Sequence, residues 1–172
     1  MIDPDMIDAE IPHLRRYARA LVREREAADD LVQDTLERAW RKRVQWRPTG
    51  RLRSWLFRML YRLYLDRRPQ LQRAHRNLIA LDDVRPPAAA GMDTDAALHC
   101  REVMAAIDAL PEKQRAILLL VALEQPSYRE GARALGLRVG TFRSRLSRAR
   151  EQLNERLVSA AEPTPTREDA NG

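Results

Sequence analysis

Apolar residues recur at helical spacing along almost the whole chain, and no stretch shows the strict alternation that is typical of a β-strand. Leu14, Tyr17, Ala18 and Leu21 stand at i, i+3, i+4 and i+7, which predicts one amphipathic helix over about residues 5–23. The periodicity therefore limits this chain to an all-α fold.

Capping and helix-breaking residues divide the remaining sequence. The acidic cluster Ala27–Asp30 favours a helix start, and Pro69 is expected to end a helix at Arg68. Ser127 and Glu130 form a capping box, and Gly136 is expected to close the short helix that follows. The expected helices cover about residues 5–23, 27–43, 52–68, 96–110, 112–123, 128–135 and 139–157.

Residues 69–97 separate two helical regions. The apolar pattern fades there, and Arg85–Gly91 has the composition of a linker. A flexible coil of about 29 residues spans roughly 30 Å, so we expect the two regions to be able to sit well apart. The prediction is two small helical domains, residues 1–68 and 98–157, joined by a flexible linker, 69–97, and followed by a disordered tail, 158–172.

Several protein classes are excluded by the composition. The longest apolar run, Ala116–Leu123, has eight residues, whereas a membrane span needs about 20. The first residues show neither a basic segment nor an apolar signal region. A single cysteine, Cys100, fits a reducing compartment. We therefore expect a cytoplasmic protein with no membrane insertion.

Catalytic constellations are missing from the sequence. The six glycines form neither a dinucleotide-binding fingerprint nor a phosphate-binding loop. His13, His75, His99 and Cys100 have no metal-ligand spacing. The prediction is that the protein is not an enzyme and has no metal site and no cofactor.

Charge is distributed in blocks. Residues 1–37 carry 5 Arg and 10 Asp or Glu, whereas residues 38–68 carry 11 Arg or Lys and one acid, Asp66. A bias towards arginine explains why 29 of the 31 cations are Arg, but it does not explain their clustering. Basic blocks of this kind indicate phosphate binding.

The second half contains a helix-turn-helix pattern. Seven Arg and one acid lie between Ser127 and Arg150, whereas a solvated helix in a bundle normally alternates charge signs. A recognition helix reads base edges from its N-terminal turns, most often with arginine on guanine. We therefore interpret the helix that starts near Val139 as a reader of duplex DNA.

Aromatic residues are interleaved with the cations of the first half, a combination that holds single-stranded nucleic acid by base stacking. Trp40, Trp55 and Leu56 stand on apolar stripes and are expected in the core. Trp46, in a loop between Gln45 and Arg47, fits loop packing and nucleic-acid contact equally well.

Four ordered motifs together resemble the bacterial RNA polymerase sigma factors of the sigma-70 family. The chain's two-domain length is similar to that of the extracytoplasmic-function (ECF, group IV) subgroup. The motifs are Asp29–Leu36 (DDLVQDTL), Leu52–Phe57 (LRSWLF), Ala109–Arg115 (ALPEKQR) and Gly140–Arg150 (GTFRSRLSRAR).

The resemblance implies a sigma domain 2 helical bundle and a sigma domain 4 helix-turn-helix, with core RNA polymerase (its β′ clamp helices and β flap), promoter DNA and an anti-sigma factor as partners. It implies that an acidic helix docks on the polymerase through Asp29, Asp30, Gln33, Asp34 and Glu37. The melted −10 element would be captured by Trp46, Arg47, Arg51, Arg53, Arg58 and Arg62. The duplex −35 element would be read by Arg138, Thr141, Arg143, Ser144, Arg145, Ser147 and Arg148.

Two residues depart from the family pattern. Arg62 stands where the family usually has Asn, so −10 preference is expected to differ. Gly131 stands where the family usually has an Ala-like residue, and glycine is less favourable in a helix by about 1 kcal/mol. Two other functions stay open: a sigma-like decoy that sequesters an anti-sigma protein without binding DNA, and an ordinary helix-turn-helix regulator with an unrelated first domain.

Overall fold

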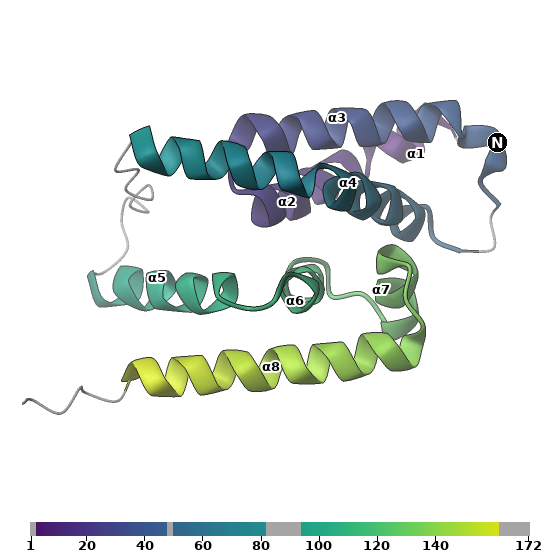
Figure 1. The fold of residues 1–172 in the computed structure, drawn as a ribbon. Coiled ribbons are helices and arrows are strands. Elements are labelled where there is room, and N and C mark those ends of the chain that lie inside the picture. The colour runs from purple at the N-terminus through teal and green to yellow at the C-terminus, as the bar shows by residue number, and fades with distance from the viewer. Residues whose placement is uncertain (1–2, 48–49, 82–93, 162–172) are drawn as a thin grey trace, which may run out of the picture.

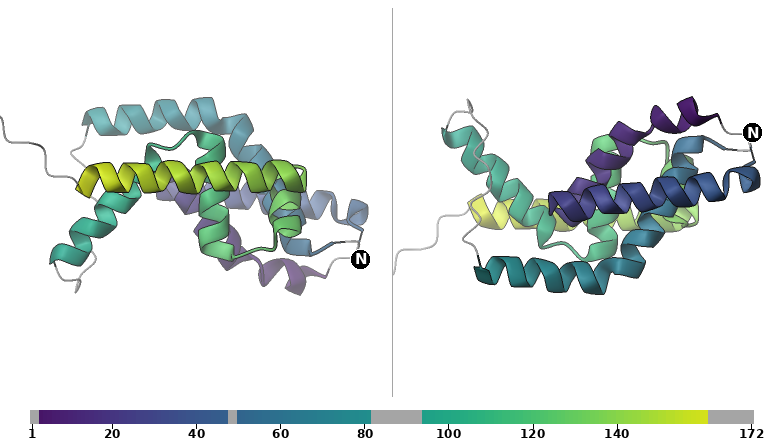
Figure 2. Two further views of the ribbon diagram at one scale, coloured as in Figure 1. Left: turned by 90° about the horizontal axis from the view of Figure 1, so that it is seen from below. Right: turned by 90° about the horizontal axis from the view of Figure 1, so that it is seen from above.

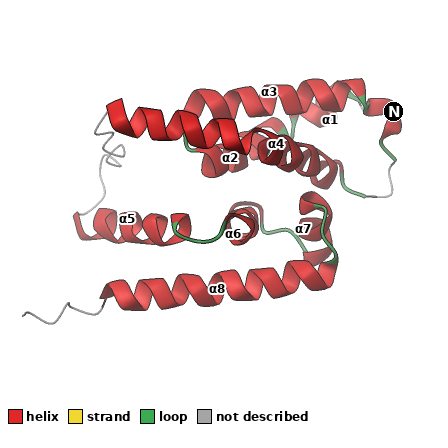
Figure 3. Cartoon of the chain, in the orientation of Figure 1, coloured by secondary structure: helices red, strands yellow, loops and turns green. Residues whose placement is uncertain are grey.

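The computed structural model describes residues 3–47, 50–81 and 94–161, and every regular element in these ranges is a helix (Figure 3). The all-α prediction is confirmed. The elements are α1 (Pro4–Asp8), α2 (Ile11–Val22), α3 (Arg25–Arg41), the 3₁₀ turn η1 (Arg43–Gln45), α4 (Leu52–Leu81), α5 (Thr94–Asp108), α6 (Glu112–Glu124), α7 (Tyr128–Leu135) and α8 (Val139–Ala161).

The helices form two layers (Figure 1). We call α1–α4 the N-terminal layer and α5–α8 the C-terminal layer. Figure 2 shows α8 as one straight helix that crosses the C-terminal layer, with α6 running across it.

The first predicted helix, residues 5–23, is two helices instead. Pro12 stands in the first turn of α2, where a proline is tolerated because an N–H there has no partner within the helix. A helix continuing from α1 would lose that hydrogen bond and clash with the ring. The expected apolar stripe of α2 is confirmed, since Leu14, Tyr17, Ala18 and Leu21 are all buried.

Helix α4 does not end before Pro69, so that prediction was wrong. It continues to Leu81 with the proline inside it. Pro69 and Leu65 are both exposed, so water can hydrate the Leu65 carbonyl that the proline leaves without an N–H partner. Figure 2 shows α4 bent along its length, as proline-containing helices commonly are.

The helix-turn-helix is confirmed at the level of individual caps. The Ser127 hydroxyl accepts from the Glu130 N–H, and the Glu130 carboxylate accepts from the Ser127 N–H, which completes the capping box. Gly136 takes a left-handed conformation (φ 67°) at the end of α7, and the Leu137 N–H donates to the Ala132 carbonyl at 2.8 Å. This geometry favours glycine, which has no Cβ to clash.

The two layers share one hydrophobic core, an arrangement that the sequence left undecided. Buried residues of both layers form a single cluster in which α2 packs on α6 and α4 packs on α7. The buried Tyr17 hydroxyl of α2 donates to the Ala116 carbonyl of α6 at 2.9 Å. The linker's length allows the halves to sit apart but does not decide their arrangement, and here they pack together. Residues 82–93 of that linker and 162–172 of the tail lie outside the described residues.

Candidate nucleic-acid interface

The exposed face of α3 carries an acidic stripe. Asp30, Gln33, Glu37 and Trp40 are all exposed, and their spacings of three, four and three residues place them on one side of the helix. We call these four residues the α3 stripe.

Three of the five predicted docking residues are paired within the N-terminal layer, and Glu37 pairs with Arg41 of its own helix at 3.6 Å. Asp34 forms an ion pair with Arg67 of α4, and the Asp29 Oδ1 lies 3.4 Å from the Arg19 Nη2. Their carboxylates therefore have partners of their own, whereas the Asp30 carboxylate has an open face to the solvent.

The prediction that Trp40 is buried was wrong. Its side chain is 45% exposed, and the Arg43 guanidinium lies 4.5 Å from its ring centroid. The core position at the end of α3 is taken by Ala39. The signal was in the sequence, because Trp40 follows Gln33 by seven residues, which is close to two full turns.

The arginines predicted for the −10 element differ in their pairing: Arg51, although 78% exposed, and Arg53 form ion pairs with carboxylates, and the others have no ion pair among the described residues. Arg47, Arg58 and Arg62 are exposed. The Arg51 Nε lies 2.7 Å from the Glu130 Oε1 of α7, and the Arg53 Nε lies 2.6 Å from the Glu10 Oε2. Part of the predicted basic surface thus faces carboxylates of this same chain.

Trp46 is half-buried and packs against the common core. This contact supports the loop-packing interpretation, and the exposed part of the ring leaves the stacking interpretation open. Trp55 is also half-buried against the core, and Leu56 is fully buried, as predicted.

The helix predicted to read the −35 element has one exposed side. Arg143, Ser144, Ser147 and Arg148 of α8 are exposed, and so is Arg138 in the preceding turn. These residues lie opposite the buried stripe of Phe142, Leu146 and Ala149. The structure thus brings the greater part of the predicted set onto one surface.

Arg145 and Thr141 differ from the rest of this set because both are half-buried. Burial, followed by the nearby Glu112, raises the pKa of Tyr61 on α4, while the guanidinium groups of Arg145 and Arg68 oppose the rise. Arg145 thus lies near the N-terminal layer, at the edge of the exposed face.

An open hollow of about 590 Å³ lies beside this face, and its lining includes two residues that the sequence interpretation missed, Tyr128 and Arg150. The Arg143 guanidinium lies 5.8 Å from the Tyr128 ring centroid. An aromatic ring in this position restrains the arginine, since a cation over a ring face is attracted to it. The lining residues are Tyr128, Gly140, Arg143, Ser144, Leu146, Ser147, Arg150 and Glu151.

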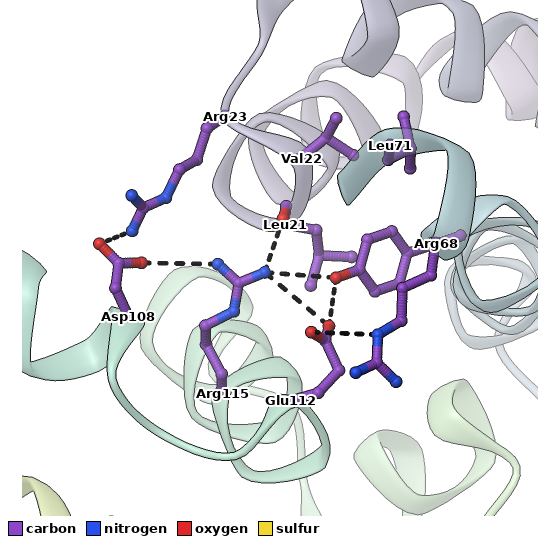
Figure 4. A pocket seen from close by; sticks show the side chains of 9 residues that line it. Leu21, Val22, Arg23, Arg68, Leu71, Asp108, Glu112 and Arg115 are labelled. Carbon is purple, nitrogen blue, oxygen red and sulfur yellow. Dashed lines mark hydrogen bonds and ion pairs between the residues drawn. The ribbon is translucent and has the colours of Figure 1, made fainter. Parts of the chain in front are cut away.

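A second cavity, of about 220 Å³, lies between the layers and is centred on Arg115 (Figure 4). The Arg115 Nη2 donates to the Leu21 carbonyl at the end of α2 at 2.7 Å and to the Tyr64 hydroxyl of α4 at 3.3 Å. Its Nη1 lies 3.5 Å from the Asp108 Oδ1, and Asp108 also pairs with Arg23. Because the charged residues that line this cavity pair with one another, we interpret the cavity as part of the contact between the layers and not as a ligand site.

Packing between the layers raises the pKa values of two buried tyrosines. Burial raises the pKa of Tyr64 to about 12, and the hydrogen bond that Tyr64 donates to Glu112 adds to the rise. Burial likewise raises the pKa of Tyr17 well above its ordinary value.

Among the described residues, no cluster of three or more His, Cys, Asp or Glu could hold a metal ion, and no helix is long and apolar enough to cross a membrane.

Two family models match separate parts of the chain. Residues 7–61 match the sigma2 domain of PhyR, and residues 100–153 match region 4 of sigma-70. The first match covers most of the N-terminal layer, and the second covers the helix-turn-helix.

Full-length relatives are similar over both layers. The chain is 36% identical to the ECF RNA polymerase sigma factor EcfG of Rhodopseudomonas palustris, over 92% of this chain and 87% of that protein. It is 37% identical to the ECF RNA polymerase sigma factor SigM of Mycobacterium tuberculosis, over 81% of this chain and 69% of that one. Among solved structures, the sigma factor RpoE of Bartonella quintana, in complex with the anti-sigma factor NepR, is similar with a TM-score of 0.67 and 27% identity, over 93% of this chain and 100% of that one.

Proposed function

This chain belongs to the ECF RNA polymerase sigma factors, and we propose that it binds core RNA polymerase and directs promoter recognition, DNA opening and transcription initiation. The observation that carries the proposal is the presence of two unlike exposed surfaces, the acidic α3 stripe and the basic face of α8, on separate layers of the molecule.

The α3 stripe is the proposed docking site for the β′ clamp helices of the polymerase. Asp30 and Glu37 would meet basic groups of the partner, and such complementarity raises the association rate and selects the partner. Trp40 adds an aromatic anchor at the end of the stripe, a residue type that is enriched in the energetic centres of interfaces. We assign Asp29 and Asp34 a secondary role, since both are paired with arginines of other helices, whereas Glu37 pairs only with the exposed Arg41 of its own helix.

The α8 face is the proposed reader of the −35 duplex, with Arg143 and Arg148 as base or phosphate contacts. The basic surface around Arg47, Arg58 and Arg62 is the proposed site for the melted −10 strand, with Trp46 available to stack on an unpaired base. No bond chemistry is required. Strand opening follows from tighter binding to the open form than to the duplex.

The proposed division of labour follows the layers: residues 1–68 for polymerase and −10 contact, and residues 98–157 for −35 contact, with the protein acting in the cytoplasm. We assign the contact with the β flap of the polymerase to residues 98–157. The boundary at residue 68 falls inside α4, because that helix continues to Leu81.

A decoy that sequesters an anti-sigma protein is the second candidate. The match of residues 7–61 to the sigma2 domain of PhyR, and the similarity to RpoE in its complex with NepR, favour binding of an anti-sigma protein. Anti-sigma binding fits both candidates, whereas the exposed cations of α8 fit only a chain that contacts DNA.

Transcription in vitro separates the two candidates. The full chain is added to core polymerase on a promoter library, and the transcripts are sequenced. A sigma factor yields transcripts from a defined set of promoters that core polymerase alone does not use. A decoy yields none, and instead restores transcription by a second sigma factor that an anti-sigma protein has inhibited.

A further inference from the structure

We propose that Ser147 and Glu151 of α8 form a hydrogen-bond acceptor pair that selects one base pair of the −35 duplex through its major-groove amino group, the N6 of adenine or the N4 of cytosine. The proposal rests on the proposed function, because it assigns a specificity contact to the face of α8 that is proposed to read the −35 element. It adds Glu151 to that face and fixes the direction of the hydrogen bond that Ser147 makes with DNA.

The proton of the Ser147 hydroxyl is committed to this chain. The Ser147 Oγ donates to the Glu151 Oε1 at 3.0 Å. A carboxylate has no N–H or O–H to donate, so the hydroxyl is the donor in this pair. A serine hydroxyl has one proton and two lone pairs. Ser147 therefore presents an acceptor to any further partner, and the second carboxylate oxygen of Glu151 is an acceptor as well.

Both side chains stand where a partner of α8 would reach them. Ser147 and Glu151 are exposed, and their spacing of four residues places them on the same side of the helix. They line the open hollow beside the basic face of α8, together with Arg143 and Arg150. The pair therefore belongs to the surface that is proposed to meet DNA.

A DNA phosphate is an unsuitable partner for this pair. Phosphate oxygens accept hydrogen bonds and do not donate them, and the Glu151 carboxylate repels their negative charge. Arginines of the same face suit phosphates and the acceptor atoms of guanine. The amino groups of adenine and cytosine are the hydrogen-bond donors that bases present in the major groove. An amino group of a base is therefore the partner that matches the acceptor pair.

Arg143 and Ser147 thus offer opposite hydrogen-bond character one turn apart on α8. The Arg143 guanidinium, which lies 5.8 Å from the Tyr128 ring centroid, only donates. Four residues of an α-helix rise about 6 Å, and successive base pairs are about 3.4 Å apart. For a helix that lies along the groove, the two side chains then face positions about two base pairs apart. The amino group that Ser147 selects should stand at that distance from the position whose preference Arg143→Ala relaxes.

Selection by the holoenzyme locates the base pair that Ser147 reads. Core polymerase with the full chain is incubated with a promoter library in which only the −35 element is randomised, and the bound duplexes are sequenced. The parent should prefer one base pair at this position by about fivefold or more, the lower end of the cost of one mismatch. Ser147→Ala should relax that preference and leave the other positions unchanged.

Glu151→Ala should relax the same position, because the Ser147 hydroxyl is then free to rotate and to donate. The matched control is Glu155→Ala. It makes the same change in net charge one turn further along α8, at an exposed residue that lies outside the lining of the hollow. The control should keep the parent's preference at every position of the −35 element, while circular dichroism shows all variants to be helical.

Base analogues at the selected position test the direction of the hydrogen bond. In one duplex the amino group is removed, with purine in place of adenine or 2-pyrimidinone in place of cytosine. In a second duplex a 7-deaza base removes the purine N7, which is an acceptor. Loss of the amino group should weaken binding by the parent about fivefold more than binding by Ser147→Ala. Loss of the N7 should weaken both to the same extent.

Three results would each overturn the proposal: unchanged −35 preferences in Ser147→Ala, equal profiles for Glu151→Ala and Glu155→Ala, or coupling of Ser147 to the N7 and not to the amino group. A parent holoenzyme that selects no −35 sequence overturns the proposed function and this proposal with it. A parent that selects one, without dependence on Ser147, overturns this proposal alone.

Discussion

The ring of Phe142 lies directly against Gly131, where α8 crosses α7. A Cβ added to Gly131 would clash with the Phe142 Cζ and stand 2.8 Å from the Cε2. The ring is fully buried, so it has no solvent to move into. Glycine at this position therefore allows the close approach of the two helices, which outweighs its poor helix propensity.

Gly131→Ala is expected to destabilise the protein by ~1–3 kcal/mol, as overpacking of a filled core usually does. Gly140→Ala is the control, because nothing lies within 4 Å of the position that a Cβ would take there; alanine at residue 140 should be neutral or stabilise by up to about 1 kcal/mol. Urea unfolding of both variants gives the free energies. A Gly131→Ala chain as stable as the parent would contradict the packing argument.

The α3 stripe is expected to control polymerase affinity. Asp30→Lys with Glu37→Lys should weaken binding of core polymerase while the melting temperature stays unchanged, because both side chains are exposed and like charge would then face a basic partner. Glu102→Lys with Glu155→Lys makes the same change in net charge on other exposed positions and should bind normally. Equal binding by the two double variants in a pull-down would refute the docking assignment.

Trp40 and Trp46 are expected to affect different steps. Trp40→Ala should cost ~2 kcal/mol in polymerase affinity if it is an interface anchor, with normal DNA opening once the complex has formed. Trp46→Ala should lose ~1–3 kcal/mol of base stacking and lower the permanganate reactivity of promoter thymines. If the Trp46→Ala holoenzyme opens DNA normally, that tryptophan serves loop packing alone.

The contribution of each α8 arginine to −35 binding is expected to follow its exposure to solvent. Arg143→Ala or Arg148→Ala should cost ~1–3 kcal/mol and relax specificity at one position if the side chain reads a base. A phosphate contact would instead weaken all sequences alike and lower the salt slope by about 1. Arg145→Ala, at the half-buried position, should change −35 binding least. Titration of −35 and scrambled duplexes at several salt concentrations distinguishes these outcomes, and a dominant effect of Arg145→Ala would reverse the assignment.

Alkaline pH should weaken the contact between the layers through Tyr64. Its pKa is about 12 in the folded chain and 10.0 in its ordinary state, so the folded chain favours the protonated phenol. The stabilisation is complete below pH 10 and is lost as the pH rises towards 12. Tyr64→Phe should therefore show a flatter loss of unfolding free energy across this range than the parent. An identical pH profile would place the alkaline sensitivity at Tyr17 or Tyr61, whose pKa values burial also raises.

Local signals in the sequence determined the helices and their caps. The spacing of Leu14, Tyr17 and Leu21 predicted a buried stripe, and Ser127, Glu130 and Gly136 predicted both ends of α7. Such features depend on residues within one or two turns of each other, so they can be read without knowledge of the fold.

Single residues whose environment is set by distant segments were harder to interpret. Pro69 was expected to end a helix, but it lies inside α4 on an exposed side, where water can hydrate the carbonyl that lacks a partner. Trp40 was expected in the core, but Ala39 takes that position. The sequence alone did not explain why glycine replaces the family's Ala-like residue at position 131, whereas the structure shows the Phe142 ring packed against it.

Only the tertiary structure decided how the two layers meet. Glu124 and Arg53 form an ion pair between the layers, although they are 71 residues apart in the sequence, and neither carries a local signal that it will pair with the other. The same is true of Arg115 and the Leu21 carbonyl. Helix periodicity reports which side of each helix is buried, but it does not report which helix covers that side. Long-range packing of apolar faces brings these charged groups together, and their pairing depends on that packing because burial is what makes an unpaired charge costly.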